Sequence, residues 1–363
     1  MPKLAYFTTI GQTRWEEHVT AAPAVAPRLR GIRRRRGLVL AALLAALGVA
    51  VLLSITVGAK AVPLADAWQA LTAPTGTEND IVIRSLRLPR TALGVLAGLA
   101  LGVAGALMQG HTRNPLADPG LLGVTQGAAF AMVAAIILLG AQSLLAYIWF
   151  GLAGALIASV GVFALGMVGG RGGPTPVTLA LAGTAVSAFL YALTSAIVLL
   201  DEQAMDVFRF WQAGSIAARG ADVLWQVLPF IVTGLVLAMA NAPGLNALSL
   251  GEDVARGLGQ NIALTRGVGV AAVTLLSGAS VAACGALAFV GLLVPHVTRP
   301  LCGTDHRWLL PYSGLVGAAL LLLADVIGRV VAPPGELEVG VVLALLGAPF
   351  FVALVRRRKP VRL

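Results

Sequence analysis

Residues 91–110 read TALGVLAGLALGVAGALMQG, a stretch that carries no charged side chain. An α-helix needs about 20 predominantly apolar residues to cross the hydrocarbon core of a bilayer, so this stretch is long enough to span a membrane. Similar runs recur along the chain, at residues 37–57, 144–168, 177–200, 223–240 and 309–331, with shorter or fused runs at 121–140, 264–294 and 339–355. The sequence therefore predicts an all-α integral membrane protein.

The composition supports this class and excludes a soluble one. Of the 363 residues, 58% are hydrophobic and only 12% are charged, which is about half the charged fraction usual in soluble domains. The run at 264–294 is too long for one crossing, and we interpret it as two helices that meet in a tight outer turn near Gly278 and Gly285. The count is then about ten transmembrane helices in a single transmembrane domain, residues 37–355.

The charges predict the orientation of these helices. Lys and Arg in short loops are retained on the cytoplasmic side of a membrane, and with both termini cytoplasmic most of the 26 Lys and Arg residues fall on that side. The run Arg33–Arg36 directly precedes the first span. We therefore expect basic cytoplasmic tails at residues 1–36, which we expect to be poorly ordered, and at 356–363. The net charge of +10 reflects topology, and no nucleic-acid partner is expected.

The usual signatures of catalysis and of metal binding are not found in the sequence. Cys284 and Cys302 fall in different segments, so a disulfide is not expected, and the four His residues lie in separate segments without ligands at metal-binding spacing. No G-x-x-x-x-G-K-[ST] phosphate loop occurs. We expect no catalytic residue, cofactor or metal in this chain, and any ATP chemistry must belong to another protein.

One ionisable pair falls within a predicted span. Asp325 is followed four residues later by Arg329, on the same face of the helix. Ion-coupled transport would need such a group to hold the coupled charge within the membrane. A structural ion pair near the outer end is the favoured interpretation, and an ion-coupled secondary transporter remains the alternative.

Two inner loops are unusually rich in proline and glycine. Residues 113–123 read RNPLADPGLLG, and residues 169–178 hold Pro174 and Pro176 among glycines. Prolines and glycines at this density prevent a continuous helix and predict a sharp, stiff bend. Such a bend at the mouth of a pathway can act as a gate, and a rigid connector is the alternative.

The segment at 247–259, ALSLGEDVARGLG, predicts a short cytoplasmic helix. Ser249 and Glu252 have the spacing of a capping box, and Gly259 can end the helix. Leu250, Val254 and Leu258 line one face. A short helix with an apolar face suits a groove on a soluble partner. The alternative is that it lies on the lipid surface, although its acidic first turn would be unfavourable next to anionic lipid.

The outer segment at 84–90, RSLRLPR, places positive charge where it is unfavourable. Arg87 and Arg90 lie at the amino-terminal end of a predicted span, next to the positive end of the helix dipole, and on the outer side of the membrane. An acidic partner that docks from outside would offset both costs. The alternative is that the two side chains reach lipid phosphates.

Glycines in the same span predict close helix packing. Gly94, Gly98 and Gly102 repeat every four residues and therefore share one face of the helix. Small residues at this spacing let the backbone of a second helix approach closely. This pattern predicts packing and carries no information about substrate.

Five motifs in the same order resemble the FecCD family, the permeases of type II ABC importers for iron siderophores, haem and cobalamin. The resemblance covers nearly the whole chain after residue 37. The motifs are LRLPR at 86–90, GVAGALMQG at 102–110 continuing into RNPLADP at 113–119, LSLGE at 248–252 with LG at 258–259, FVGLLVPH at 289–296, and GTDHR at 303–307.

The resemblance implies partners and roles for specific residues. It implies a second permease chain in a homodimer or heterodimer, two ATPase subunits that bind ATP and Mg²⁺, and an extracytoplasmic substrate-binding protein. The ATPase-coupling helix would comprise Ser249, Leu250, Gly251, Glu252, Asp253, Val254 and Leu258. The cytoplasmic gates would comprise Asn114, Pro115, Leu116 and Thr175. Acidic residues of the binding protein would meet Arg87, Arg90 and Arg329.

The resemblance also suggests a substrate and a location. The sequence of residues 107–124 and 208–215 is most similar to the corresponding segments of permeases for ferric siderophores. An iron chelate is therefore the expected substrate, with haem or cobalamin as the alternative. The expected location is the bacterial cytoplasmic membrane, where the chain would be a multi-pass protein in contact with the lipid bilayer. The permease itself would not be an enzyme.

Overall fold

The structure is a computed structural model that describes residues 26–58, 61–140, 144–168, 175–332 and 335–357. The parts of the predicted tails at 1–25 and 358–363 lie outside the described residues. All regular secondary structure in the described part is helical, which confirms the predicted all-α class. In chain order the helices are α1 (Ala26–Thr56), α2 (Leu64–Thr72), α3 (Glu78–Ile81), η1 (Val82–Arg87), α4 (Leu88–Thr112), η2 (Pro119–Leu122), α5 (Val124–Leu139), α6 (Leu144–Met167), α7 (Pro176–Val198), α8 (Glu202–Ala213), α9 (Ala221–Leu248), α10 (Glu252–Gly257), α11 (Ile262–Cys284), α12 (Val290–Cys302), α13 (His306–Val331) and α14 (Val339–Arg357).

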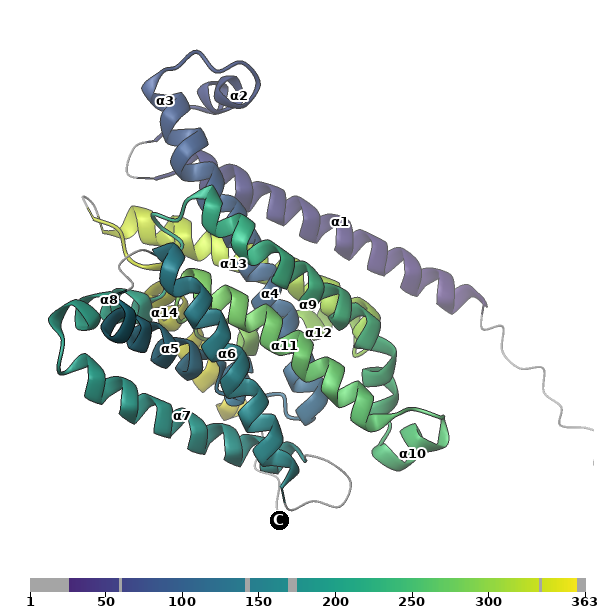
Figure 1. Ribbon diagram of the computed structural model, residues 1–363. Coiled ribbons are helices and arrows are strands. Elements are labelled where there is room, and N and C mark those ends of the chain that lie inside the picture. Colours follow the sequence, from purple (N-terminus) through teal and green to yellow (C-terminus); the bar gives the residue numbers. More distant parts are fainter. Residues whose placement is uncertain (1–25, 59–60, 141–143, 169–174, 333–334, 358–363) are drawn as a thin grey trace, which may run out of the picture.

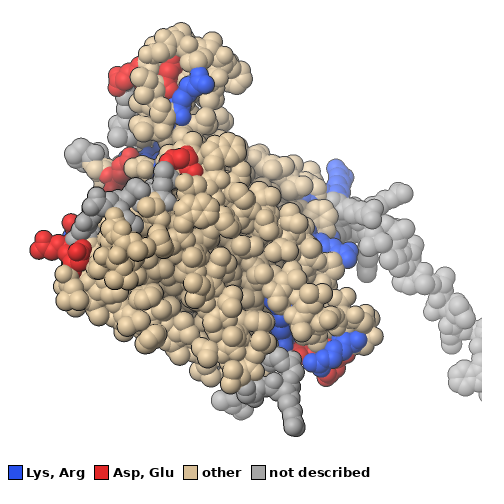
Figure 2. Space-filling view, in the orientation of Figure 1, with Lys and Arg blue, Asp and Glu red and all other residues tan. Residues whose placement is uncertain are grey.

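Seven helical stretches in the described part are long and apolar enough to cross a membrane, and they contain α1, α4, α6, α7, α9, α11 and α13. Helices α5 and α14 are shorter apolar helices, and α12 has 13 residues. On the face shown in Figure 2, the charged side chains gather at the two ends of the molecule and leave a broad uncharged band between them. That pattern suits a bilayer, because charge is costly in hydrocarbon. The exact count of ten spans and the cytoplasmic position of both termini remain predictions.

Helix α4 forms the centre of the bundle (Figure 1). Within the most apolar 18-residue stretch of its span, 78% of the residues are buried, whereas the corresponding share in α1 is 17%. Its glycines let α13 approach closely: a Cβ added to Gly102 would lie 2.2 Å from the carbonyl oxygen of Ser313, and one added to Gly98 would lie 2.5 Å from that of Gly317. The predicted glycine face is therefore real, and α13 is the helix that packs on it.

The long apolar run at 264–294 does divide into two helices, but only one of the two expected glycines breaks it. Gly278 lies inside α11, where a Cβ would meet the side chain of Ala155, so this glycine serves packing between α11 and α6. Gly285 follows the last residue of α11 and has φ +78°, a conformation that glycine adopts at little cost. The turn therefore begins at Gly285, and the part of the prediction that concerns Gly278 is wrong.

Helix α1 lies at the edge of the bundle and is joined to α13 near the start of its predicted span. It begins at Ala26, ahead of the predicted start of the first span at Gly37. The hydroxyl of Tyr312 donates a hydrogen bond of 2.6 Å to the carbonyl oxygen of Arg36, and the guanidinium of Arg36 lies 5.3 Å from the ring centroid of Trp308. Since little of α1 is buried, these contacts and those at its other end determine where it sits.

Helices α2 and α3 form a small lobe beyond the outer end of α1 (Figure 1). Thr77 and Asp80 form a capping box at the start of α3, in which the hydroxyl of Thr77 accepts from the backbone N–H of Asp80 and the carboxylate of Asp80 accepts from that of Thr77. From α3 the chain continues through the π-helical turn η1 directly into α4. The lobe thereby places Arg87, the last residue of η1, beside the end of α1.

Candidate functional site

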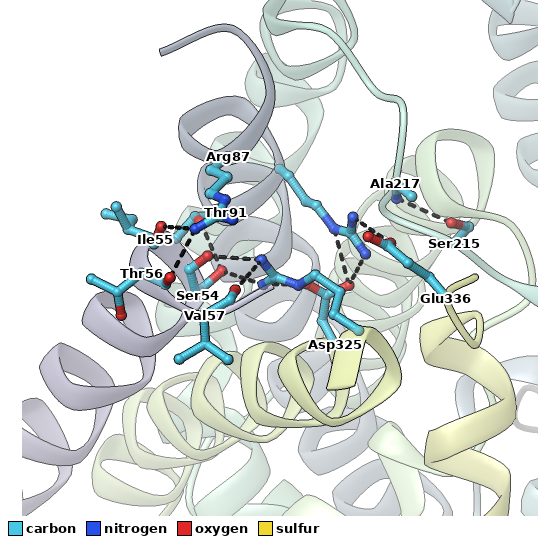
Figure 3. A network of polar contacts seen from close by, with 12 residues as sticks. Ser54, Ile55, Thr56, Val57, Arg87, Thr91, Ser215, Ala217, Asp325 and Glu336 are labelled. Carbon is cyan, nitrogen blue, oxygen red and sulfur yellow. Dashed lines mark hydrogen bonds and ion pairs between the residues drawn. The ribbon is translucent and has the colours of Figure 1, made fainter. Parts of the chain in front are cut away.

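Two buried arginines cap the outer end of helix α1 (Figure 3). Nη1 of Arg87 donates to the carbonyl oxygens of Ile55 and Thr56, at 2.7 Å and 2.9 Å. Nη1 of Arg329 donates to those of Ser54 and Val57, at 2.9 Å and 3.0 Å. The last carbonyls of a helix have no partner within the helix and lie at the negative end of its dipole, so guanidinium groups suit this position well.

A chain of ion pairs extends from this cap toward the outer surface. Arg329 pairs with Asp325 at 2.8 Å, which confirms the predicted structural ion pair on one helix face. The other oxygen of Asp325 accepts from Nη2 of Arg90 at 2.7 Å, and Nη1 of Arg90 pairs with Glu336 at 2.8 Å. We call Arg87, Arg90, Arg329, Asp325 and Glu336 the outer arginine cluster.

The outer arginine cluster lines a cavity of about 700 Å³. Its charged lining consists of Arg87, Arg90, Arg219, Arg329 and Glu336, so cationic groups predominate. The buried Nε atoms of Arg219 and Arg329 have no hydrogen-bond partner among the described residues. A cavity lined by several guanidinium groups favours an anionic occupant such as a carboxylate.

Burial divides the three predicted docking residues into two kinds. Arg87 and Arg329 are 7% and 3% exposed, and their guanidinium groups are engaged with α1. The side chain of Arg90 is 14% exposed, and its guanidinium group pairs with the carboxylates of Asp325 and Glu336. Docking of an acidic partner on all three remains a prediction, and Arg90 is the member whose partners an incoming carboxylate could replace.

Glu336 and the cap on α1 are the features that sequence reasoning missed. The sequence identified Arg87 and Arg90 as misplaced charges, but the α1 carbonyls are 31 or 32 residues away from Arg87, and Glu336 is 246 residues away from Arg90. A sequence signal did exist for α1, because it ends without a basic residue in its last turn and so needs a cap from elsewhere.

The inner loop at 113–123 bends as predicted. Arg113, with φ +49°, ends α4 in the left-handed conformation. Two side-chain turns follow: Oδ1 of Asn114 accepts from the N–H of Leu116 at 3.0 Å, and Oδ1 of Asp118 accepts from that of Gly120 at 2.8 Å. These bonds fix the backbone on both sides of Pro115 and make the loop stiff.

The bent loop packs against helices on both sides. A Cβ added to Gly183 of α7 would lie 1.7 Å from the carbonyl oxygen of Leu121, and one added to Gly291 of α12 would lie 2.7 Å from Pro119. Thr175 caps the start of α7 in a capping box with Thr178. A shift of α7 would therefore act directly on the loop, although the gate role of Asn114, Pro115, Leu116 and Thr175 stays a prediction.

The predicted short helix exists as α10, but its predicted capping box is wrong, and its cytoplasmic position stays a prediction. The N-cap is Gly251, with φ +113°, and no side chain caps the helix. The hydroxyl of Ser249 instead donates to the carbonyl oxygen of Asn246 at 2.6 Å. Glu252 does not reach back to the cap, because its carboxylate pairs with Arg256 and with Arg266 of α11.

The ion pairs hold α10 while its apolar face remains exposed. Leu250, Val254 and Leu258 are 63%, 50% and 62% exposed. The Arg266 side chain that receives Glu252 is 10% exposed, whereas that of Asp253 is 99% exposed. An oriented short helix with three exposed apolar side chains in or beside it suits docking to a soluble partner, and this role stays a prediction.

The described residues hold no group of three or more His, Cys, Asp and Glu that could bind a metal ion. Cys284 and Cys302 are both buried free thiols. At each end of the molecule, ion pairs join charged side chains of that same end, and at the outer end Arg87 and Arg329 also donate to backbone carbonyl oxygens. Apolar spans, a stiff inner loop, a protruding helix and an outer cationic cavity together define a multi-pass membrane permease.

The comparisons identify the family. The FecCD transport family matches residues 43–357, and the chain belongs to this family, as the resemblance predicted. It is accordingly a permease subunit of an ABC importer and not an enzyme. In importers of this family the ATPase activity lies in separate subunits, which suits a chain made largely of apolar helices.

Similar proteins of known role share most of the length of this chain. The chain is 47% identical to the ferric enterobactin transport system permease protein FepD of Escherichia coli strain K12, over 89% of this chain and 96% of that protein. It is 43% identical to the iron(3+)-hydroxamate import system permease protein FhuB of Bacillus subtilis strain 168, over 85% and 80%. A solved metal-chelate type ABC transporter in an inward-facing conformation has 29% identity and a TM-score of 0.78, and the match covers 88% of this chain and 99% of that one.

Proposed function

We propose that this permease imports a ferric siderophore. The two curated relatives reported above carry ferric enterobactin and iron-hydroxamate transport in their names, and the solved neighbour is described as a metal-chelate transporter. An iron chelate is therefore favoured over haem or cobalamin. The described spans present mainly Ala, Gly, Leu and Val, which would hold a large chelate loosely, so selectivity is assigned to a separate binding protein.

The permease works as a dimer in this proposal. In helix α7, only 17% of the residues in its most apolar 18-residue stretch are buried. Large apolar side chains are also exposed on α14. Lipid covers part of such surfaces, and a second permease chain, identical or related, would cover the rest and enclose the pathway. The proposal requires two chains because one bundle with a buried α4 at its centre leaves no room for a large chelate within itself.

The observation that carries the proposal is the exposed apolar face of α10. Leu250, Val254 and Leu258 project from a helix that Glu252 and Arg266 hold in place. In the proposal this face seats in a groove on an ATPase subunit, and closure of two ATPase subunits on ATP shifts α10 and, with it, α9 and α11. The free energy for uptake enters through the different affinities of the two permease states for the nucleotide-bound ATPases.

The outer arginine cluster has a matching role on the opposite side. An extracytoplasmic binding protein that presents carboxylates would dock over the cationic cavity and release its substrate toward the pathway. Arg90 is the contact that we assign to such a carboxylate. Arg87 and Arg329 support the site by holding α1 and the lobe beside it.

Uptake by the reconstituted system tests the proposal. The chain, its permease partner, the ATPase subunits and the binding protein are placed in proteoliposomes, and uptake of radiolabelled iron as a catecholate chelate, a hydroxamate chelate or citrate is measured beside radiolabelled cobalamin. We expect ATP-dependent uptake of at least one iron chelate and none of cobalamin. Preference for cobalamin would overturn the substrate, and concentrative uptake by the permease alone on an ion gradient would favour the secondary-transporter alternative.

A further inference from the structure

The outermost member of the outer arginine cluster is a carboxylate of the chain itself. Glu336 pairs with Nη1 of Arg90 at 2.8 Å, and its side chain is 35% exposed. Figure 3 shows Glu336 and Asp325 on two sides of the same guanidinium group. The position of Glu336 is therefore the one that a carboxylate arriving from outside would need to occupy.

We propose that Glu336 is a built-in substitute for the docking carboxylate, so that the binding protein docks by carboxylate exchange at Arg90. In the free permease Glu336 neutralises Arg90, and in the docked complex a partner carboxylate takes its place. This inference rests on the proposed function, because it assumes that an acidic partner docks over the cationic cavity. It adds that the site is occupied in the resting state by a competitor from the same chain.

Burial explains why Glu336 and not Asp325 is exchanged. The side chain of Asp325 is 2% exposed and pairs with both Arg90 and Arg329, so its removal would leave the buried Arg329 without a carboxylate partner and Arg90 with Glu336 alone. Glu336 has a single ion pair among the described residues and faces water. Water around the partly exposed Glu336 carboxylate weakens this ion pair relative to a fully buried one, so Glu336 can leave Arg90 more readily than Asp325 can.

Charge balance favours the exchange in the docked state. If a partner carboxylate approached while Glu336 remained in contact with Arg90, three carboxylates, including Asp325, would surround one guanidinium group. Exchange keeps two carboxylates on Arg90 and avoids like-charge repulsion. The displaced Glu336 can turn toward water, because its side chain is already partly exposed.

The connector that carries Glu336 leads directly into α14. The N–H of Leu337 donates to the carbonyl oxygen of Gly328 on α13 at 3.0 Å, and that of Gly340 on α14 donates to the carbonyl oxygen of Gly214 at 3.0 Å. Release of Glu336 therefore frees a side chain immediately before the outer end of α14. Docking would thus be sensed at the start of a helix that we assign to the permease interface.

Substitution of Glu336 should strengthen docking of the binding protein, whereas removal of a charged surface contact usually weakens docking. In the assembled transporter in nanodiscs, the probe is the substrate-binding protein that supports uptake, and its dissociation constant is measured by biolayer interferometry at fixed ionic strength. We expect Glu336→Gln, and likewise Glu336→Ala, to tighten docking by about two- to fivefold, the factor that corresponds to loss of one exposed ion pair. Arg90→Gln should weaken docking.

Glu338 offers a matched control. It lies two residues further on in the same connector and makes no ion pair among the described residues, so Glu338→Gln changes the net charge equally without freeing Arg90. We expect Glu338→Gln to leave docking unchanged. Equal tightening by both Gln variants would show a long-range charge effect and overturn the exchange.

The outcomes separate the exchange from the docking site itself. Weaker docking of Arg90→Gln without tighter docking of the Glu336 variants would leave the docking site in place and overturn the exchange. Unchanged docking of Arg90→Gln would overturn the assignment of the docking site. ATPase activity of each variant complex shows that the subunits have assembled.

Discussion

The two ends of the molecule use the same kind of ion pair for different purposes. At the outer end, Arg329 and Asp325 are 3% and 2% exposed, and their contacts stay within the chain. At the inner end, Glu252 anchors α10 through Arg266 while the leucines of α10 remain exposed. The buried Arg329–Asp325 pair therefore fixes structure, whereas the inner pair holds α10 so that, in the proposed function, its exposed apolar face can meet a partner. The difference shows that burial, more than residue type, decides what a charged pair does.

The largest effect that this comparison predicts is on stability, at Arg329. Arg329→Ala removes two hydrogen bonds to α1 carbonyls and leaves the buried Asp325 with one cation instead of two. Breaking a buried pair costs about 3–5 kcal/mol, so the melting temperature in detergent should fall steeply. Arg209→Ala is the control, because Arg209 and its partner Asp206 are 68% and 66% exposed. Similar melting temperatures of the two variants would contradict the structural role of the outer pairs.

The next effect is on coupling, at Glu252. Glu252→Lys places a cation against Arg266 and should turn α10 away from its position, so uptake should fall by about tenfold or more while basal ATPase activity persists. Asp253→Lys, at a neighbouring side chain that is 99% exposed, should reduce uptake less. Uptake and ATPase activity are measured in proteoliposomes. Full transport by Glu252→Lys would contradict the role of α10 as the coupling helix.

The smallest effect on stability is expected on the exposed face of α10. Leu258→Ala should change the free energy of unfolding by less than about 0.5 kcal/mol, because an exposed side chain loses little on truncation. It should nevertheless weaken co-purification of the ATPase subunits. Leu264→Ala, at a residue of α11 that is 64% exposed, is the control that should retain the ATPases. Equal retention by both variants would remove the apolar face from the proposed interface.

Features encoded within a few residues could be predicted from the sequence. The glycine face of α4, the stiff loop around Pro115 and the apolar face of α10 all follow from local spacing, and the described structure contains each of them. The capping box of Ser249 was wrong because two other contacts compete with it, one local and one between helices. The Ser249 hydroxyl donates to the carbonyl oxygen of Asn246, and Glu252 pairs with Arg266, which lies fourteen residues further along the chain.

The roles of the arginines could be predicted only in part. Positive charge at the outer start of α4 predicted an acidic partner protein for Arg87 and Arg90, with lipid phosphates as the alternative, because spacing gave no sign of partners within the chain itself. The structure shows that α1 carbonyls engage Arg87, and that Asp325 and Glu336 engage Arg90. Each of these contacts joins segments that only the packed bundle brings together.

The sequence by itself determined the membrane class, the approximate helices and the family. The length of an apolar run decides whether a helix can cross a bilayer, and a short motif decides where the chain turns, so both are local properties. Only the tertiary structure decided which charges are satisfied internally and which remain available to partners. The reason is that a buried charge must find a counter-charge or a carbonyl wherever the fold supplies one, at any separation along the chain. Arg87 and Arg329 bind carbonyl oxygens of α1, and Glu336 is one of the two carboxylates that pair with Arg90.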